Sequence, residues 1–372
     1  MIELPPAIQL IKSEIKIEDN SPQEILKDIK KLIPELMRQS EWALENFDYS
    51  DSPNIRREND FAISPVSGLN PFDNRGKCSE LNCRIKTALN FSRTFGLYGD
   101  VIYVPDSFTD ILSIKDKWSD TSLRHLCTEI IIIKILLPLI ESGVIRFTHP
   151  IQPYCISCME KMEQTLEILT YEMLEDVVDE VNISFTDSSF SIDTHNLHIP
   201  SIIRNRYFKS KVSKKTIDKN IQKALYDLVS DEVHNHLFAM NSARDNQATV
   251  VSNSRLGLDS LKRLEGTKNE LNNVEWERAR TIELPWVSKL MPAEIVMLRE
   301  DASQALPQFR ELMHRKIVLE NDGGLDDDEK KTHQMLSELR VQAIDVKSEI
   351  ERLGQKNDRF FYNLTEIGRA HV

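Results

Sequence analysis

The sequence predicts an α/β or α+β protein with a mixed sheet core and crossover helices, flanked by an N-terminal helix and a C-terminal antiparallel helical hairpin. Short apolar segments alternate with long helical segments between residues 80 and 275, which is typical of a sheet covered by helices. Beyond this region, apolar residues recur every three or four positions, which indicates amphipathic helices.

The composition is that of a globular protein. The chain has 372 residues, of which 40% are hydrophobic and 28% are charged. Its formal charge of -12 argues against broad binding to nucleic acids or to anionic membranes. The first residues lack the basic and apolar parts of a secretory signal, and the apolar run Ile130–Ile140 is too short to span a bilayer. With an odd number of cysteines, these features predict a cytoplasmic protein.

Residues 1–47 are predicted to contain an amphipathic helix. Ser21 is the expected N-cap, Pro22 takes the first helical position, and Glu24 stands three residues after the cap. The apolar residues that follow share one face, so this helix needs an apolar surface to cover. They are Ile25, Ile29, Leu32, Leu36 and Met37.

Residues 48–79 are rich in Pro, Asn, Ser and Gly and show no sustained apolar period. This length and composition are typical of a linker. We therefore expect the segment to join the N-terminal helix to the α/β domain, which covers residues 80–275.

The α/β domain is expected to begin with a strand, a crossover helix and a second strand, at Asp100–Val104, Ser119–Ser142 and Val144–Thr148. This order favours parallel pairing of the two strands, because parallel neighbours need a long connection. The later segments predict a helix over Met159–Val178, a hairpin in which Ile183 and Phe185 face Phe190 and Ile192, a helix over Lys214–Met240 and a strand over Ala248–Ser252.

Residues 276–365 are predicted to form an antiparallel helical hairpin of the coiled-coil type. Two segments with the three-four apolar spacing lie on either side of the break NDGGLDDDE. Their apolar seams would bind a protein partner or a second copy of the chain. The alternative is that both helices pack on the α/β domain. The seam positions expected to carry binding are Leu298, Phe309, Leu339 and Ile350.

The last seven residues, Glu366 to Val372, read EIGRAHV and resemble a translated reading frame of a sequencing adapter. We therefore expect residues 366–372 to be a non-native tail and the native text to stop near Thr365. The gene product would then be cut short on its C-terminal side.

Cys155 and Cys158 form a C-x-x-C at the start of a predicted helix. Amide donors and the helix dipole lower the pKa of a thiol there, as redox dithiols require. A second hypothesis adds His195 and His198, because two thiolates and two imidazoles satisfy a tetrahedral zinc ion. A third leaves both cysteines as small packed side chains. The sequence predicts no cofactor by itself, although zinc or another divalent cation is compatible with these residues.

Asp106 follows the first predicted strand, at a carboxyl end where open parallel sheets bind ligands. With Asp100 and Asp110 nearby, a carboxylate cluster could hold a divalent cation for phosphodiester chemistry. The competing role is structural, because Asp106 is well placed to cap the helix that begins at Ser107.

A basic segment between residues 204 and 223 surrounds Tyr207 and Phe208. Basic residues interleaved with aromatic ones can hold phosphates and stack on bases, so nucleic acid is a secondary hypothesis. A charge run before a helix is more often a solvated connector. The candidate phosphate contacts are Arg204, Arg206, Lys214 and Lys215.

Glu232 and His236 share a helix face four residues apart, a usable metal spacing, but the H-E-x-x-H order is absent. The leading interpretation is a cytosolic interaction or scaffold protein, which binds a protein partner or itself through helical seams, and it is favoured over an enzyme. The alternatives are a metal-dependent phosphodiesterase or nuclease that uses Asp106 and its neighbours, and a zinc-stabilised domain built on Cys155 and Cys158.

Overall fold

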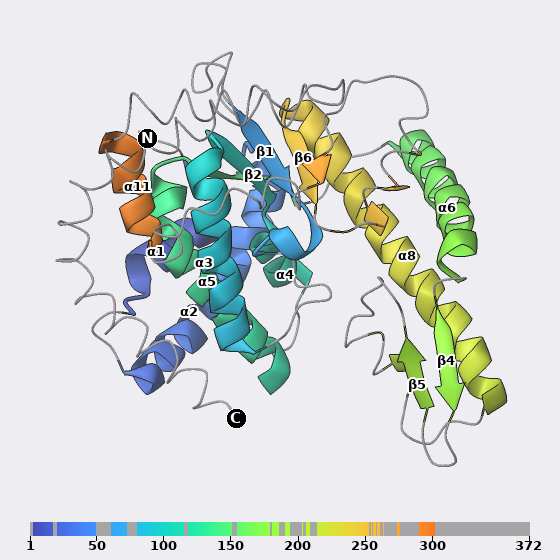
Figure 1. The fold of residues 1–372 in the computed structure, drawn as a ribbon. Coiled ribbons are helices and arrows are strands. Elements are labelled where there is room, and N and C mark those ends of the chain that lie inside the picture. The colour runs from blue at the N-terminus through green and yellow to red at the C-terminus, as the bar shows by residue number, and fades with distance from the viewer. Residues whose placement is uncertain are drawn as a thin grey trace.

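The computed structural model describes most of the chain up to residue 301 (Figure 1). The described residues are 3–17, 21–49, 61–72, 80–114, 118–150, 155–178, 181–185, 190–193, 203, 206–208, 214–252, 254, 256–257, 259–260, 263, 274–275 and 290–301. Within them, the side chains of residues 22, 98, 110, 113–114, 120–121, 182–185, 190–193, 214–218, 274–275 and 301 lie outside the description.

A parallel sheet forms the centre of the molecule, with the strand order β3-β2-β1-β6-β7. All pairs in this sheet are parallel, and antiparallel pairing is confined to a separate hairpin. The predicted α/β or α+β fold is therefore confirmed. The strands are β1 (Ala62–Pro65), β2 (Val101–Pro105), β3 (Ile145–Thr148), β6 (Thr249–Ser252) and β7 (Val274–Glu275).

The predicted strand, crossover helix and second strand are confirmed as β2, α5 (Asp120–Glu141) and β3. Ser119 caps α5, because its side chain accepts a hydrogen bond from the backbone N–H of Ser122. The helix ends at Glu141, and Gly143, two residues later, has a φ of 77°, a left-handed conformation that glycine adopts at little cost. The sharp stop lets the chain enter β3 directly.

Both faces of the sheet are buried, as expected for a parallel sheet. Side chains such as Ile63, Ile102 and Val104 contribute to the larger core. The alternate side chains, such as Val101 and Tyr103, pack with the C-terminal half of α8 (Lys214–Asp245) on the other face. The helices of the larger core are α1 (Pro6–Glu14), α2 (Pro22–Asn46), α3 (Leu81–Tyr98), α4 (Ser107–Ile114), α5 and α11 (Pro292–Asp301).

The N-terminal helix is confirmed as α2, with the predicted capping box between Ser21 and Glu24. The Ser21 backbone N–H donates to Glu24 Oε2 over 2.8 Å, and the Glu24 backbone N–H donates to Ser21 Oγ over 3.4 Å. Ile25, Ile29 and Leu36 are fully buried in the larger core. The apolar face of α2 is therefore covered by its own chain.

The predicted linker over residues 48–79 is wrong for residues 61–72. This stretch contains β1, the central strand of the sheet, followed by the short 3-10 helix η1 (Ser67–Leu69). Phe61, Ile63 and Phe72 belong to the larger core. A strand of four residues ending in proline carries no sustained alternation, so only its long-range pairing identifies it.

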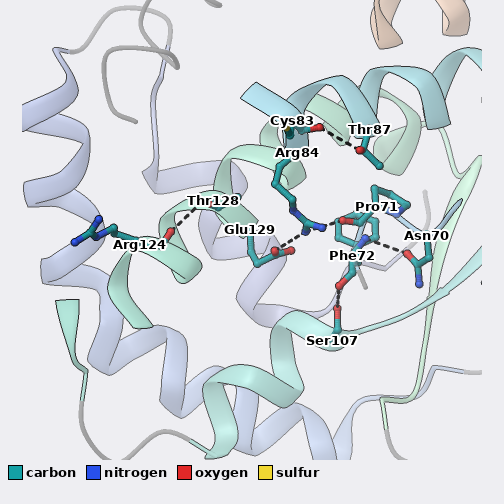
Figure 2. Close-up of polar contacts among 10 residues, drawn as sticks. All are labelled: Asn70, Pro71, Phe72, Cys83, Arg84, Thr87, Ser107, Arg124, Thr128 and Glu129. Atoms are coloured by element: carbon teal, nitrogen blue, oxygen red, sulfur yellow. Dashed lines mark hydrogen bonds and ion pairs between the residues drawn. The ribbon is translucent and has the colours of Figure 1, made fainter. Parts of the chain in front are cut away.

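The loop after β1 accepts hydrogen bonds from side chains of two other elements, α3 and α4 (Figure 2). Arg84 of α3 donates from Nη2 to the Pro71 carbonyl over 2.8 Å and to Glu129 Oε1 of α5 over 2.7 Å. Ser107 of α4 donates from Oγ to the Phe72 carbonyl over 2.9 Å. The loop is thus held against the core by buried polar groups.

A second, smaller unit consists of α6 (Ile156–Val178), the N-terminal half of α8 and the hairpin β4 (Asn182–Phe185) and β5 (Phe190–Asp193). In Figure 1, α8 runs from the sheet toward the hairpin, with α6 along its outer side. The hairpin register is the predicted one, because Ile183 pairs with Ile192 and Phe185 pairs with Phe190. Among the described helices, none is long and apolar enough to cross a bilayer.

Candidate functional site

The helix α6 has one buried side, which packs on α8. Leu169, Met173 and Val177 of α6 form a core with Ala224, Leu225, Leu228 and Val229 of α8. The three α6 residues stand four positions apart, which places them on one side of the helix. This packing fixes which side of α6 points outward.

The outward side of α6 also carries large apolar side chains, which alternate with acidic ones. Among the described residues, the large hydrophobic side chains with substantial exposure are Trp42 of α2 and five residues of α6. Four of these five lie within roughly a third of the helix circumference at 3.6 residues per turn. We call the five residues the α6 face: Ile156 (76% exposed), Met159 (44%), Ile168 (59%), Tyr171 (53%) and Val178 (42%).

Acidic residues surround the α6 face. The helix carries six carboxylates against one basic residue, Lys161. Arg263 pairs with Asp176 and lies 4.0 Å from Glu172, near the end of the helix. The surface therefore combines exposed apolar area with negative charge. The carboxylates, all exposed, are Glu160, Glu163, Glu167, Glu172, Glu175 and Asp176.

Cys155 and Cys158 lie at the start of α6, and both thiols are exposed. The backbone N–H of Cys158 donates to the Cys155 carbonyl over 2.9 Å, which closes the first turn between the two residues. A hydrogen bond from the Cys158 thiol, followed by backbone N–H groups, lowers the pKa of Cys155. The same contact raises the pKa of Cys158. The hypothesis that these cysteines are buried packing residues is therefore wrong.

The other half of the predicted zinc site, His195 and His198, lies outside the described residues. Within the described part of the chain, no group of three or more His, Cys, Asp and Glu side chains is placed to hold a metal ion. The structure thus brings together only the two thiols of the proposed ligand set.

The predicted carboxylate cluster around Asp106 is not formed by the described side chains. Asp100 precedes β2 and accepts a hydrogen bond from the Phe61 backbone N–H, whereas Asp106 follows β2. The two residues therefore lie at opposite ends of the strand, roughly 20 Å apart at 3.3 Å per residue. Asp110 belongs to α4, and its side chain is outside the description.

Asp106 has the structural role that competed with catalysis. It is fully buried, and its Oδ1 accepts from the Thr109 backbone N–H over 2.9 Å at the start of α4. Its Oδ2 accepts from the Tyr49 hydroxyl over 2.9 Å. Burial and the nearby Asp106 carboxylate raise the pKa of Tyr49 far above its usual value. Both carboxylate oxygens are therefore used inside the protein.

Arg206, Tyr207 and Phe208 of the basic segment contact other parts of their own chain. Arg206 pairs with Asp227 over 2.9 Å, and the Tyr207 hydroxyl donates to the same carboxylate. Tyr207 and Phe208 pack against the core between α6 and α8, rather than forming an open platform for bases. Arg204 lies outside the described residues, as do the side chains of Lys214 and Lys215.

The predicted C-terminal seam is described only at its beginning, in α11. Leu298 and Ile295 are 1% and 0% exposed, and both belong to the larger core beside α3 and α5. Leu298 is therefore covered by its own chain and is not available to a partner, which matches the alternative of a helix packed on the α/β domain. Phe309, Leu339 and Ile350 lie outside the described residues.

Glu232 and His236 belong to a hydrogen-bonded chain at the carboxyl end of the sheet, where β1 and β6 are neighbours. His236 Nε2 lies 2.7 Å from Ser252 Oγ, and its Nδ1 lies 2.8 Å from the Glu232 carbonyl and 3.5 Å from Glu232 Oε2. Ser67 Oγ donates to Glu232 Oε2 over 2.9 Å. This is the point of an open sheet where ligands usually bind.

The serine, imidazole and carboxylate of this chain follow the order of a nucleophilic triad. However, Ser252 and His236 are both 0% exposed, and Gly257 lies directly against the imidazole ring. The Ser252 hydroxyl also accepts from the Ser254 backbone N–H over 3.0 Å. These hydrogen-bonded side chains therefore connect α8 to the ends of β1 and β6. The Ser252 hydroxyl is buried and is not accessible to a substrate.

Comparison with protein-family models, with curated proteins and with solved structures gives no match for this chain. The α6 face was not predicted from the sequence. Its signal was present, since Ile156, Ile168 and Tyr171 fall outside the stripe formed by Leu169, Met173 and Val177. A helix with two apolar stripes has one stripe more than a single packing partner needs.

Proposed function

We propose that this chain is a cytosolic interaction protein that binds a basic amphipathic helix of a partner protein through the α6 face. The observation that carries the proposal is the exposure of five large apolar side chains on one helix, next to six carboxylates. Several large apolar side chains exposed on one surface element of a soluble protein often mark a binding site. A bound amphipathic helix contacts such a surface through apolar residues at its positions i, i+3, i+4 and i+7.

The negative charge of α6 favours a partner helix that carries basic residues. Lysine and arginine beside the apolar anchors of a partner helix would lie opposite the carboxylates and speed association. A second copy of this chain would instead set like charges against each other, which opposes self-association. The partner is therefore expected to be a different protein with a basic, amphipathic segment.

The test uses the full chain and a synthetic helical peptide with leucines at the anchor positions and lysines on its polar face. The control peptide has the same leucines with glutamates in place of the lysines. Fluorescence anisotropy should show binding of the basic peptide only, with an affinity that falls as salt is raised. Equal binding of both peptides, no binding of the basic one, or dimerisation through α6 in sedimentation would overturn the proposal.

Replacing Tyr171 by serine is expected to weaken binding of the basic peptide by about tenfold, which corresponds to ~1.4 kcal/mol. Tyr171 is 53% exposed, and its ring lies 5.7 Å from that of Tyr226 on α8, which presents it from a fixed base. Anisotropy titrations give the affinity. The matched control is Trp42→Ser, which removes an aromatic side chain of 49% exposure from α2 and should leave the affinity unchanged.

A further inference from the structure

We propose that Cys155 and Cys158 form a thiol–disulfide exchange site, with Cys155 as the attacking thiol, Cys158 as the resolving thiol and a disulfide as substrate. The pair borders the α6 face and shares Ile156 and Met159 with it, but its redox chemistry does not require that a partner helix binds there. Its support is the geometry of the first turn of α6, the exposure of both thiols and the apolar residues beside them.

The first turn of α6 holds the two cysteines together. The backbone N–H groups of Cys158 and Met159 both donate to the Cys155 carbonyl, over 2.9 and 3.0 Å. Residues three apart on a helix lie on the same side, so the thiols are neighbours. The pair can therefore close to a disulfide without unwinding the helix.

The other described cysteines lack this arrangement. Cys127 is 3% exposed, and burial raises its pKa to about 12, so it is a poor nucleophile at neutral pH. Cys83 is exposed and lies on α3, and in the sequence no cysteine stands three or four residues away from it. Cys83 thus serves as a natural control for exposure alone.

The surroundings favour a disulfide substrate. Ile156, between the two cysteines, is 76% exposed, and Met159 is 44% exposed directly after them. A polypeptide or organic disulfide can rest on this apolar surface while the Cys155 sulfur reaches its S–S bond. The position at the helix start supplies amide donors to a thiolate at Cys155.

The exchange balances in two steps. The Cys155 thiolate attacks one sulfur of the substrate disulfide, forms a mixed disulfide and expels the other sulfur as a thiolate, which takes a proton. Cys158 then loses its proton and attacks the Cys155 sulfur, which expels the second substrate thiolate. The protein is oxidised by two electrons to the Cys155–Cys158 disulfide, and the substrate is reduced by two electrons to two thiols.

The test treats the full chain with oxidised glutathione at pH 7, followed by acid quenching, alkylation and mass spectrometry of the peptides. The native chain should form the Cys155–Cys158 disulfide, and Cys158→Ser should stop at a mixed disulfide between Cys155 and glutathione. The Cys155→Ser variant should form neither product at a comparable rate. Cys83→Ser should behave as the native chain.

Cys155 is expected to react faster than Cys83, because a lowered pKa leaves more of the Cys155 thiol as thiolate at pH 7. Equal rates at Cys83 and Cys155 would overturn the proposal, as would failure of the intramolecular disulfide to form at any glutathione ratio. If the native protein holds one equivalent of tightly bound zinc and the Cys155→Ser variant holds none, the exchange proposal is overturned and the two thiols are metal ligands. Peptide binding to the α6 face is measured separately, so either proposal can fail alone.

Discussion

Replacing Glu129 by alanine is expected to lower the free energy of unfolding by about 3–5 kcal/mol, because it leaves a buried guanidinium without its carboxylate. Arg84 and Glu129 are 3% and 2% exposed and lie 2.7 Å apart, in the contact drawn in Figure 2. Urea unfolding followed by circular dichroism measures the change. Among exposed pairs, removal of a partner costs less than about 1 kcal/mol.

The large cost comes from the environment of Arg84 rather than from the strength of the pair. Water cannot solvate the freed cation, since the loop residues Pro71 and Phe72 cover it on one side and α5 on the other. Lys12–Glu141 provides the matched control, since its N···O distance is also 2.7 Å but its side chains are 44% and 41% exposed. Glu141→Ala should change stability by less than about 1 kcal/mol.

A double substitution separates the cost of burying an unpaired Arg84 charge from the loss of the attractive Arg84–Glu129 contact itself. In Arg84→Met with Glu129→Leu, no charge remains buried, so much of the stability lost in Glu129→Ala should return. The recovery should be incomplete, because the Pro71 carbonyl also loses the 2.8 Å hydrogen bond from Arg84. If Glu129→Ala and Glu141→Ala cost the same, burial does not control the energetics of these pairs.

Local features of the fold could be predicted from the sequence, because local chemistry determines them. Ser21 and Glu24 lie three residues apart and form the capping box wherever the helix packs. The same holds for the hairpin, since Ile183 and Ile192 face each other once the turn lies between them. These elements need no information from distant parts of the chain.

Elements that depend on distant partners could not be predicted in this way. β1 contains Ser64 and ends at Pro65, and it is identified as the central strand only by pairing with β2 and β6, which lie far along the sequence. Leu298 has the spacing of a partner seam, but α3 and α5 cover it. An apolar stripe shows that a helix needs a cover and does not show which surface provides it.

In the candidate site, too, local features could be predicted from the sequence and features that depend on distant partners could not. The C-x-x-C and its position at a helix start were local features, and the structure confirms that Cys155 and Cys158 lie at the beginning of α6. The α6 face depends on which side of α6 packs against α8, and only the three-dimensional arrangement decides that. The carboxylates Asp100 and Asp106 were close in sequence but lie at opposite ends of a strand.

Replacing Gly257 by alanine is expected to lower the free energy of unfolding by about 1–3 kcal/mol, because the added methyl group would overlap the His236 ring. A Cβ at this position would lie 1.9 Å from His236 Cε1 and Nε2. The ring cannot swing aside without breaking its hydrogen bonds to Ser252 and to the Glu232 carbonyl. Gly96→Ala is the control, because its Cβ would meet the flexible end of Leu139 at 3.1 Å.

His236→Ala should also destabilise the fold, by roughly 2–4 kcal/mol, because it creates a cavity and leaves the buried Ser252 hydroxyl without one partner. Combined with Gly257→Ala, the total should be smaller than the sum of the two single costs by about 0.5–3 kcal/mol. The reason is that the alanine methyl then occupies space which the imidazole has left. Additive costs in this double-mutant cycle would contradict direct contact between Gly257 and His236, and with it the arrangement that fastens α8 to the ends of β1 and β6.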